Sequence, residues 1–439
     1  MQTVLIRGGR VIDPARGFDE TADVVLDEGM VAKISTTHGT LRAEDADQVI
    51  DAEGCIVAPG LIDMHVHLRE PSGGRHEETI ATGTAAAIAG GFTGVCCMPN
   101  TTPPLDSAKM IRQVLAKAGE AGQARVLPAG CATAGRKGAE AAPIAKMAAA
   151  GAMAITDDGG VVADAGVMEQ VLRAARDAER CCMQHCQEPS MTRGSSMNAG
   201  RLAERLGEIG WPAEAEEIVV ERDIDLNREI GCRYHVQHIS AGGSVKLVRD
   251  AQREGEPVTA EVSPHHLLLT EAACEGQDTN AKMNPPLRRK GDIKALKEGV
   301  ADGTITILAT DHAPHPRKTK DVPFAEAAFG IVGLDCALPL YVKALIEGGV
   351  IDWPAMLAMM TINPARLLGA DRIGLGTLVE GGPADVTVID PDLEWTIEAE
   401  KFASTGRNCP FEGWEVKGKA VAVVVAGEVK MCVDRQRVR

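Results

Sequence analysis

The chain has 439 residues, of which 45% are hydrophobic, and this suits a large α/β domain together with a smaller one. Its formal net charge of −16 argues against a nucleic acid or an anionic membrane as partner, although a local arginine or a metal ion can still bind a small anion. The start of the chain lacks the pattern of an export signal, and no apolar run is long enough to span a membrane. Most of the 12 cysteines stand in apolar strands, which predicts reduced, buried thiols in a cytoplasmic protein.

The first part of the chain contains short β-like runs separated by Gly, Asp and Pro. These runs are residues 3–6, 23–26 and 48–57, and they indicate a small all-β unit. Pro59-Gly60 then ends this pattern, and a different one begins.

From residue 61 onward, short apolar strands alternate with Ala-rich segments of helical period. The predicted strands are residues 61–67, 93–98, 125–131, 152–156, 181–185, 233–239, 257–262 and 305–310. The clearest helical segments are residues 77–90, 107–121, 165–179 and 214–230, and residues 130–152 are predicted to form a loop and a helix. Eight such strands in alternation are typical of a (β/α)₈ TIM-like barrel. A doubly wound open sheet is the alternative, but no Gly-x-Gly-x-x-Gly turn follows the first strand.

After residue 370 short β-like runs return at residues 376–379, 385–389 and 420–425. We predict that both chain ends together form a small β-sandwich domain, residues 1–58 and 371–439. The barrel would then occupy residues 59–370.

The sharpest local motif is Asp63-Met-His65-Val-His67-Leu-Arg69. Side chains alternate along a strand, so residues 65, 67 and 69 are expected to point the same way. Two imidazoles about 7 Å apart on one face can hold a metal ion between them. A lone His-x-His is weak evidence, and the other polar residues at strand ends strengthen it.

Further histidines and acids fall at the ends of predicted strands, where barrel enzymes carry their active sites. They are Asp157 and Asp158 after the fourth strand, His185 at the fifth, His238 at the sixth and Asp311 at the eighth. Imidazole and carboxylate ligands suit zinc, with manganese or cobalt as substitutes. Six ligands are more than one tetrahedral ion needs, so we expect two ions bridged by one carboxylate and a hydroxide. Cys182 and Cys186 flank His185 and are expected to pack in the core.

Several segments resemble the amidohydrolase superfamily and, within it, the bacterial class I dihydroorotases, over nearly the whole chain. The segments are residues 60–71 (Gly-Leu-Ile-Asp-Met-His-Val-His-Leu-Arg-Glu-Pro), 98–100 (Met-Pro-Asn), 156–159 (Thr-Asp-Asp-Gly), 282–288 (Lys-Met-Asn-Pro-Pro-Leu-Arg), 310–315 (Thr-Asp-His-Ala-Pro-His) and 329–334 (Phe-Gly-Ile-Val-Gly-Leu). The Met-Asn-Pro-Pro-Leu-Arg segment is the most telling for this branch. The segment Ser-Gly-Gly-Arg-His-Glu-Glu at 72–78 departs from the usual pattern.

The resemblance implies that His65 and His67 bind one ion with Asp311, and that His185 and His238 bind a second. Many superfamily members bridge their ions with a carboxylated lysine, but this chain has no lysine between Lys146 and Lys246. Its Asp-Asp-Gly pattern is similar to the branch that uses an aspartate. The spacing to His185 favours Asp158 as the bridge, with Asp157 as the alternative.

The resemblance also implies a substrate site. Arg69, Asn100 and His315 are similar to the family's anchors for the dihydroorotate carboxylate, and Asn284 and the backbone at Phe329-Gly330 to its contacts with the ring amide. Asp311, facing the hydroxide, is expected to move the proton as the catalytic residue. The implied reaction closes N-carbamoyl-L-aspartate to L-dihydroorotate in pyrimidine biosynthesis.

Two other functions compete with this interpretation. A hydantoinase or allantoinase shares the fold and metals but usually carries the bridging lysine. An inactive subunit that scaffolds aspartate transcarbamoylase typically lacks metal histidines, which this chain retains. The resemblance leaves open a homodimer and an association with aspartate transcarbamoylase.

Overall fold

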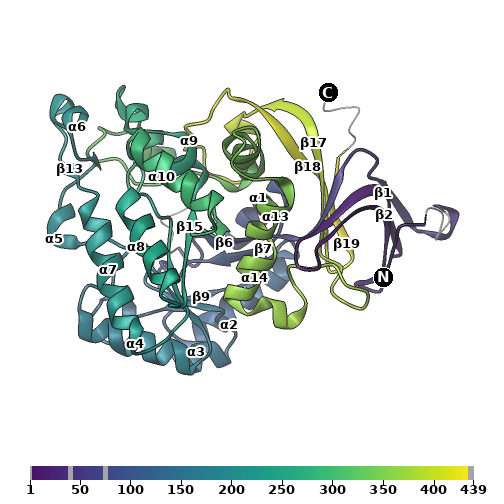
Figure 1. Ribbon diagram of the computed structural model, residues 1–439, viewed down its shortest axis with the longest axis horizontal. Helices are drawn as coiled ribbons and strands as arrows, with labels where there is room; N and C mark the ends of the chain where they lie inside the picture. Colours follow the sequence, from purple (N-terminus) through teal and green to yellow (C-terminus); the bar gives the residue numbers. More distant parts are fainter. Residues whose placement is uncertain (1, 38–42, 73–77, 434–439) are drawn as a thin grey trace.

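The computed structural model describes residues 2–37, 43–72 and 78–433. It contains a barrel of parallel strands surrounded by helices and a smaller sheet that includes both ends of the chain (Figure 1). Most of the unusual loop at 72–78 lies outside the described residues. Among the described residues, no helix has the length and apolar character needed to cross a membrane.

Eight parallel strand positions form the barrel. They are β6 (Leu61–Val66), β7 (Phe92–Cys97), β8 (Arg125–Val126) with β9 (Ala129–Cys131), β10 (Ala154–Thr156), β11 (Cys181–Gln184), β14 (Tyr234–Val236), β15 (Val258–Val262) and β16 (Ile307–Leu308). The third position is split around Pro128, which has no N–H to donate, so β8 pairs with β7 and β9 with β10. The ring closes where His67 N–H donates to His312 O at 2.9 Å. The predicted barrel is confirmed, and the open sheet is excluded.

Helices surround the barrel and connect its strands (Figure 1). The longer ones are α1 (Ile80–Gly90), α2 (Ala108–Ala121), α4 (Ala165–Asp177), α7 (Glu214–Arg228), α8 (Gly242–Arg253), α10 (Lys290–Ala301) and α13 (Trp353–Met360). The shorter ones are α3 (Ile144–Ala149), α5 (Pro189–Thr192), α6 (Arg201–Leu206), α9 (Pro264–Leu268), α11 (Arg317–Lys320), α12 (Ala337–Tyr341) and α14 (Ile362–Leu368). In α4 the Asp164 side chain caps the first turn, and Val167, Val171 and Ala175 share one buried face because they are spaced one helical turn apart.

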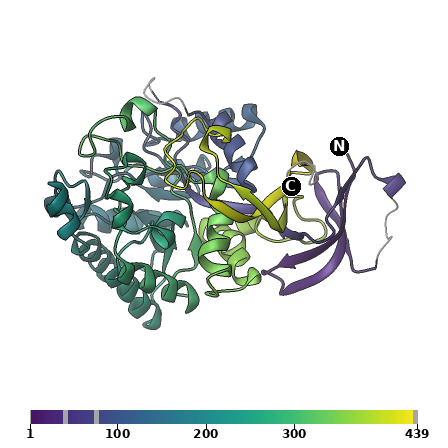
Figure 2. The ribbon, with the colours of Figure 1, turned by 90° about the horizontal axis from the view of Figure 1, so that it is seen from above.

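The two chain ends form one mixed sheet of eight strands. Its members are β1 (Val4–Asp13), β2 (Phe18–Asp27), β3 (Met30–Ser35), β4 (Gln48–Asp51), β5 (Ile56–Pro59), β17 (Val386–Thr396), β18 (Glu415–Val425) and β19 (Glu428–Cys432). Strand β5 joins the two halves, since it pairs parallel to β1 and antiparallel to β17. Figure 2 shows the N-terminal strands (purple) and the C-terminal strands (yellow) in the same part of the molecule. This sheet has a hydrophobic core of its own.

One predicted strand is wrong: residues 376–379 form a turn and coil. Gly374 and Gly376 both have positive φ, which bends the chain, and Asp13 binds the backbone N–H of Leu378. The apolar pattern arose because Leu378 is buried in the core of the small sheet. Two edge strands, β3 and β19, were missed because one face of each is solvated and neither is a continuous apolar run.

Residues 397–416, which the predicted division assigns to the small domain, pack against barrel loops. They share a buried cluster with residues that follow barrel strands, including Met283, Phe324 and Ile331. Since loops that follow barrel strands lie at the C-terminal end of the barrel, the C-terminal segment reaches the end where the predicted site residues stand.

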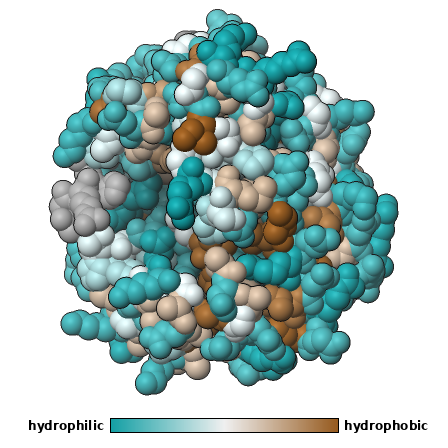
Figure 3. Space-filling view, turned by 90° about the vertical axis from the view of Figure 1, so that its left-hand side faces the viewer, coloured by the Kyte–Doolittle hydropathy of each residue, from teal (hydrophilic) through white to brown (hydrophobic). Residues whose placement is uncertain are grey.

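The surface beside β13 (Gly210–Trp211) and α7, at the left of Figure 1, is mostly hydrophilic (Figure 3). Hydrophobic residues form separate patches on this face. Ile209, which precedes β13, and Ile218, which is in α7, are 59% and 46% exposed. Single exposed hydrophobic residues of this kind are ordinary on a protein surface and need no functional explanation.

Candidate metal centre and active site

All six predicted metal ligands lie at the C-terminal end of the barrel strands. His65 stands in β6 and His67 just after it, and the others follow β10, β11, β14 and β16. Each of the six is at most 5% exposed. Four imidazoles and two carboxylates are therefore buried together at the end of the barrel where such enzymes carry their chemistry.

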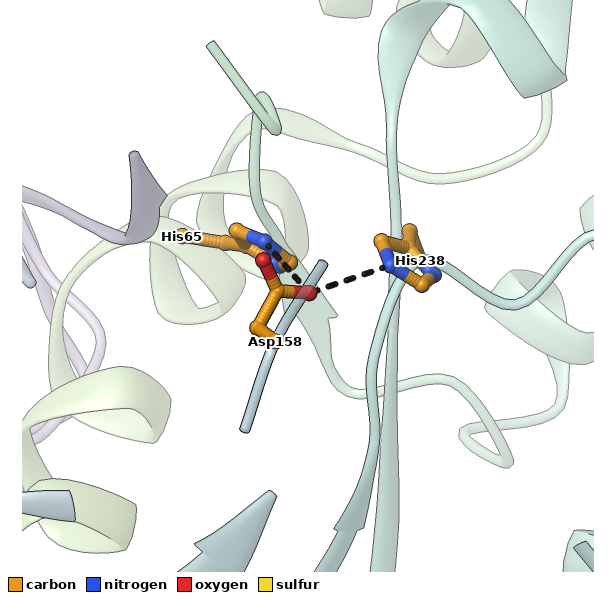
Figure 4. A group of neighbouring side chains, drawn as sticks. All are labelled: His65, Asp158 and His238. Carbon is orange, nitrogen blue, oxygen red and sulfur yellow. Dashed lines mark ion pairs between the residues drawn. The ribbon is translucent and has the colours of Figure 1, made fainter. Parts of the chain in front are cut away.

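Two overlapping groups of these residues could hold a metal ion. One consists of His65, His67 and Asp311, and the other of His65, Asp158 and His238. Figure 4 shows the Asp158 carboxylate between His65 and His238, which come from different strands. His185 joins the second group through its Nδ1 atom, which lies 3.6 Å from Asp158 Oδ1 and 2.8 Å from His238 Nε2.

Asp158 contacts both groups through its two oxygens. Its Oδ1 lies 3.3 Å from His65 Nε2 and 3.5 Å from His238 Nε2, and its Oδ2 lies 3.4 Å from His67 Nε2. Asp157 points elsewhere, because its Oδ1 accepts hydrogen bonds from the N–H groups of Ala132 and Thr133. Only Asp158 of the pair therefore faces the histidines.

The arrangement suits a cation. His65 Nε2 and Asp158 Oδ1 are buried and make no hydrogen bond, although the two atoms face each other. Burial lowers the pKa of His65, but Asp158, Glu261 and Asp311 raise it by more, so its pKa lies well above the usual value. A site that attracts a proton this strongly attracts a divalent cation for the same electrostatic reason, and its donors are those that such ions prefer.

Three of the predicted site residues have left-handed backbone. The φ angles are 58° at Arg69, 31° at His238 and 48° at Asp311, a region that side chains other than Gly rarely adopt. Such conformations cost about 1–3 kcal/mol each and cluster at functional sites, where the surrounding structure maintains them. At Asp311 the turn directs Oδ1 toward His67 Nε2, 3.0 Å away.

A cavity of about 280 Å³ opens beside the histidines. It is lined by five of the six predicted ligands and by every predicted substrate residue, namely Arg69, Asn100, Asn284, His315, Phe329 and Gly330. His65 does not line it. The structure therefore brings together residues that the sequence spreads over more than half of the chain.

A buried cation lines the cavity. Arg69 donates to Pro314 O and lies 3.3 Å from His315 Nε2. Burial lowers the pKa of Arg69 to about 10, so the side chain is still charged at neutral pH. Asn100 Oδ1 faces His67 Nδ1 at 2.9 Å, which leaves the amide NH₂ group of Asn100 to donate to a ligand. Gly159 borders this amide, because a Cβ there would lie 2.8 Å from Asn100 Nδ2.

Asn284 and the 329–330 segment also line the cavity. Asn284 Oδ1 is buried without a hydrogen bond, so it can accept one from a ligand. Gly330 N–H donates to Lys282 O, and Gly330 O accepts from Asn408 Nδ2 and Lys320 Nζ. Because both backbone groups of Gly330 are engaged, the predicted backbone contact with a ring amide rests mainly on Phe329.

Sequence reasoning missed Glu261, a fully buried acid in β15. Its carboxylate lies 2.5 Å from His65 Nδ1 and 3.1 Å from His235 Nε2, and it accepts from His238 N–H. Burial raises the pKa of Glu261, and the facing His65 and His235 lower it by more, to about 2. Its position orients His65 so that Nε2 faces Asp158. An acid within the apolar run of a buried strand was the available signal.

The cysteines beside His185 pack in the core, as expected. Cys182 and Cys186 are both buried, and Cys186 Sγ contacts the Tyr234 hydroxyl at 3.5 Å. All of the cysteines are free thiols.

Comparisons with known proteins bear on this site. The Dihydro-orotase-like family model matches residues 54–244, and the Amidohydrolase family model matches residues 256–430. The chain is 47% identical over 428 residues to a dihydroorotase of Pelotomaculum thermopropionicum, covering 98% of each chain. It is 46% identical over 426 residues to a dihydroorotase of Geobacter sp. strain M21, covering 97% of this chain and 98% of that one. The chain belongs to the dihydroorotase family.

Solved structures with the same fold include hydantoinases. The L-hydantoinase (dihydropyrimidinase) from Arthrobacter aurescens superposes on this dihydroorotase family member with a TM-score of 0.86 at 24% identity, covering 98% of this chain and 96% of that one. The D-hydantoinase from Thermus sp. gives a TM-score of 0.82 at 23% identity, covering 98% of this chain and 95% of that one. At these identities the likeness shows the fold alone.

Proposed function

We propose that the chain is a metal-dependent dihydroorotase, which interconverts N-carbamoyl-L-aspartate and L-dihydroorotate in pyrimidine biosynthesis. One observation carries this proposal: the same cavity is lined by a cluster of histidines and carboxylates and by the buried cation Arg69. A cyclic amide with its own carboxylate suits both features, because the amide can face the metal ligands while the carboxylate pairs with Arg69. The relatives that are 46–47% identical are named dihydroorotase, which supports the same substrate.

The metal ligands in this proposal are His65, His67, Asp158, His185, His238 and Asp311. Zinc is the proposed ion, with two per chain, and manganese or cobalt would be substitutes. Asp158 is the proposed bridge, and its contacts with imidazoles of both groups support this role. When bound, the ions would supply Lewis acidity and lower the pKa of water.

Protein residues would bind the substrate and transfer the proton. Arg69, Asn100 and His315 would hold the substrate carboxylate, and Asn284 and the Phe329-Gly330 segment would orient the ring amide. During ring opening the Asp311 carboxylate would accept a proton from the attacking water and pass it to the leaving ring nitrogen. During closure Asp311 would accept the proton of the attacking ureido nitrogen and donate it to the departing hydroxyl, and solvent would supply the one further proton that closure consumes.

A direct assay of carbamoyl aspartate cyclisation, with metal analysis of the same sample, tests the proposal. Hydantoin and allantoin serve as comparison substrates. Turnover of these neutral rings without turnover of dihydroorotate would replace the proposal with the hydantoinase or allantoinase function. Absence of all turnover in metal-loaded protein would favour a scaffolding subunit.

Removal of metal is expected to abolish activity. Close to two divalent ions per active chain are expected, because both oxygens of Asp158 face imidazoles and two ligand groups overlap at His65. The measurement combines elemental analysis with activity before and after a strong chelator, and restoration by zinc is the control. Full activity in protein shown to be metal-free would contradict the prediction.

Arg69→Met is expected to raise KM for dihydroorotate strongly while the metal content stays nearly unchanged. Methionine fills much of the same volume, but it cannot form the ionic hydrogen bonds, each worth about 1.5–3 kcal/mol. Steady-state kinetics and metal analysis of the variant give the answer. Unchanged kinetics would indicate that a neutral cyclic imide is the substrate.

The expectations of a homodimer, of an association with aspartate transcarbamoylase and of a cytoplasmic location stay predictions. Size-exclusion chromatography of the chain, alone and with aspartate transcarbamoylase, measures the first two.

A further inference from the structure

Asn408 belongs to none of the predicted strands, helices or site residues. It stands on the segment between β17 and β18 that packs against the barrel. It is 2% exposed. Its side chain donates to Ala313 O at 2.9 Å and to Gly330 O at 3.0 Å, and it accepts from His315 N–H at 3.1 Å. One buried amide thus connects two loop segments that each contribute a residue to the cavity wall.

Close contacts restrict the movement of the backbone segment that carries Asn408. Its backbone C=O accepts from Val332 N–H at 3.0 Å. Two residues earlier, a Cβ on Gly406 would lie 2.6 Å from Val332 Cγ1 and 2.8 Å from Pro314 Cβ, so only glycine allows this close approach. The neighbouring Ser404 and Thr405 bind Glu78, which further ties the segment to the barrel.

His315 and Gly330 are also packed against each other. A Cβ on Gly330 would lie 2.8 Å from His315 Cδ2 and 2.8 Å from Ala313 O. Small shifts of either segment would therefore change the position of His315 relative to Arg69, whose guanidinium is 3.3 Å away. Asn408 bonds to one N–H and two C=O groups at this junction. Without it, Ala313 O and His315 N–H lose this hydrogen bond, while Gly330 O keeps the bond from Lys320 Nζ.

We propose that Asn408 is a positioning residue for the substrate-carboxylate side of the cavity, acting through His315 and Gly330. The inference rests on the proposed function, because it assigns that side of the cavity to the substrate carboxylate. Asn408 does not line the cavity, so its effect would be on substrate binding and not on proton transfer. The segment that carries it comes from the C-terminal part of the chain, which makes the active site dependent on that segment.

Asn408→Ala is expected to raise KM for dihydroorotate about tenfold, with kcat within about twofold of wild type and unchanged metal content. Asn408→Asp has the same shape and keeps the acceptor for His315 N–H, but it removes both donated bonds, so its KM should also rise. Steady-state kinetics, metal analysis and the melting temperature are measured for each variant.

Asn227→Ala is the matched control. Asn227 is also fully buried and its side chain also ties a backbone segment, since it donates to Cys232 O and accepts from Cys232 N–H. Cys232 precedes β14, so this junction lies at the opposite end of the barrel from the cavity. The control should lower the melting temperature and leave KM unchanged.

A double-mutant cycle tests whether Asn408 affects substrate binding through His315. The effect of Asn408→Ala on KM should be smaller in the His315→Ala background than in wild type. An unchanged KM in both Asn408 variants, an equal effect in the two backgrounds, or an equal rise in KM for Asn227→Ala would each overturn the inference. If the wild type does not turn over dihydroorotate, the proposed function fails instead, which separates the two failures.

Discussion

Asp311→Asn is expected to lower kcat by at least about a hundredfold in both ring opening and ring closure. Asparagine has nearly the same shape and can still direct an oxygen toward His67, whose Nε2 lies 3.0 Å from Asp311 Oδ1. It cannot accept and release a proton at neutral pH. Some metal should therefore stay bound while proton transfer fails.

Both directions are expected to slow because of the proton balance of the reaction. Carbamoyl aspartate has one more carboxylate than dihydroorotate, so ring closure consumes a proton. The equilibrium constant for closure then gains about tenfold per unit fall in pH, or about 1.4 kcal/mol. An enzyme cannot change this equilibrium, so a group that accepts the proton in one direction must return it in the other.

Steady-state rates in both directions, from acid to alkaline pH, measure this effect for wild type and Asp311→Asn, with metal content determined on the same samples. Asp223→Asn is a control for the loss of a buried carboxylate. Asp223 is fully buried and accepts from the Tyr234 hydroxyl at 2.9 Å, and it does not line the cavity. If Asp311→Asn lost rate in only one direction, a single proton shuttle would be ruled out.

Asp158→Ala is expected to lose both metal and turnover. Its two oxygens face imidazoles of both ligand groups, with Oδ1 3.5 Å from His238 Nε2 and Oδ2 3.4 Å from His67 Nε2. Alanine would leave these imidazoles without the charge that draws a second cation to the site. Since the chain has no lysine near this strand end, added bicarbonate should not restore activity.

Asp157→Ala is the matched control for Asp158→Ala. Asp157 binds the N–H groups of Ala132 and Thr133, so its loss should lower the melting temperature and leave most of the metal bound. Metal analysis, activity and thermal unfolding of the two variants distinguish the neighbours. Loss of metal in Asp157→Ala alone would show that the bridge is assigned one residue too late.

The barrel could be predicted from the sequence because its signal is local. Apolar strands and segments of helical period alternate along the chain, and each was recognisable within a short window. The pair His65 and His67 was equally accessible, because side chains two apart on a strand share a face. The ends of parallel strands meet at one end of a barrel, so His185, His238 and Asp311 could be grouped before any distance was known.

The tertiary structure decided what lies beyond those local rules. Asp157 and Asp158 follow β10, where the chain leaves the strand and alternation no longer determines direction, so only their contacts distinguish them. Asn408 donates hydrogen bonds to residues that are 78 and 95 positions away, and no periodic pattern marks such a contact. The residue types and the alternation of strands and helices along the sequence thus determined the barrel and which chemical groups stand at the C-terminal end of its strands. The orientation of each side chain there depends on packing between segments that are distant in sequence.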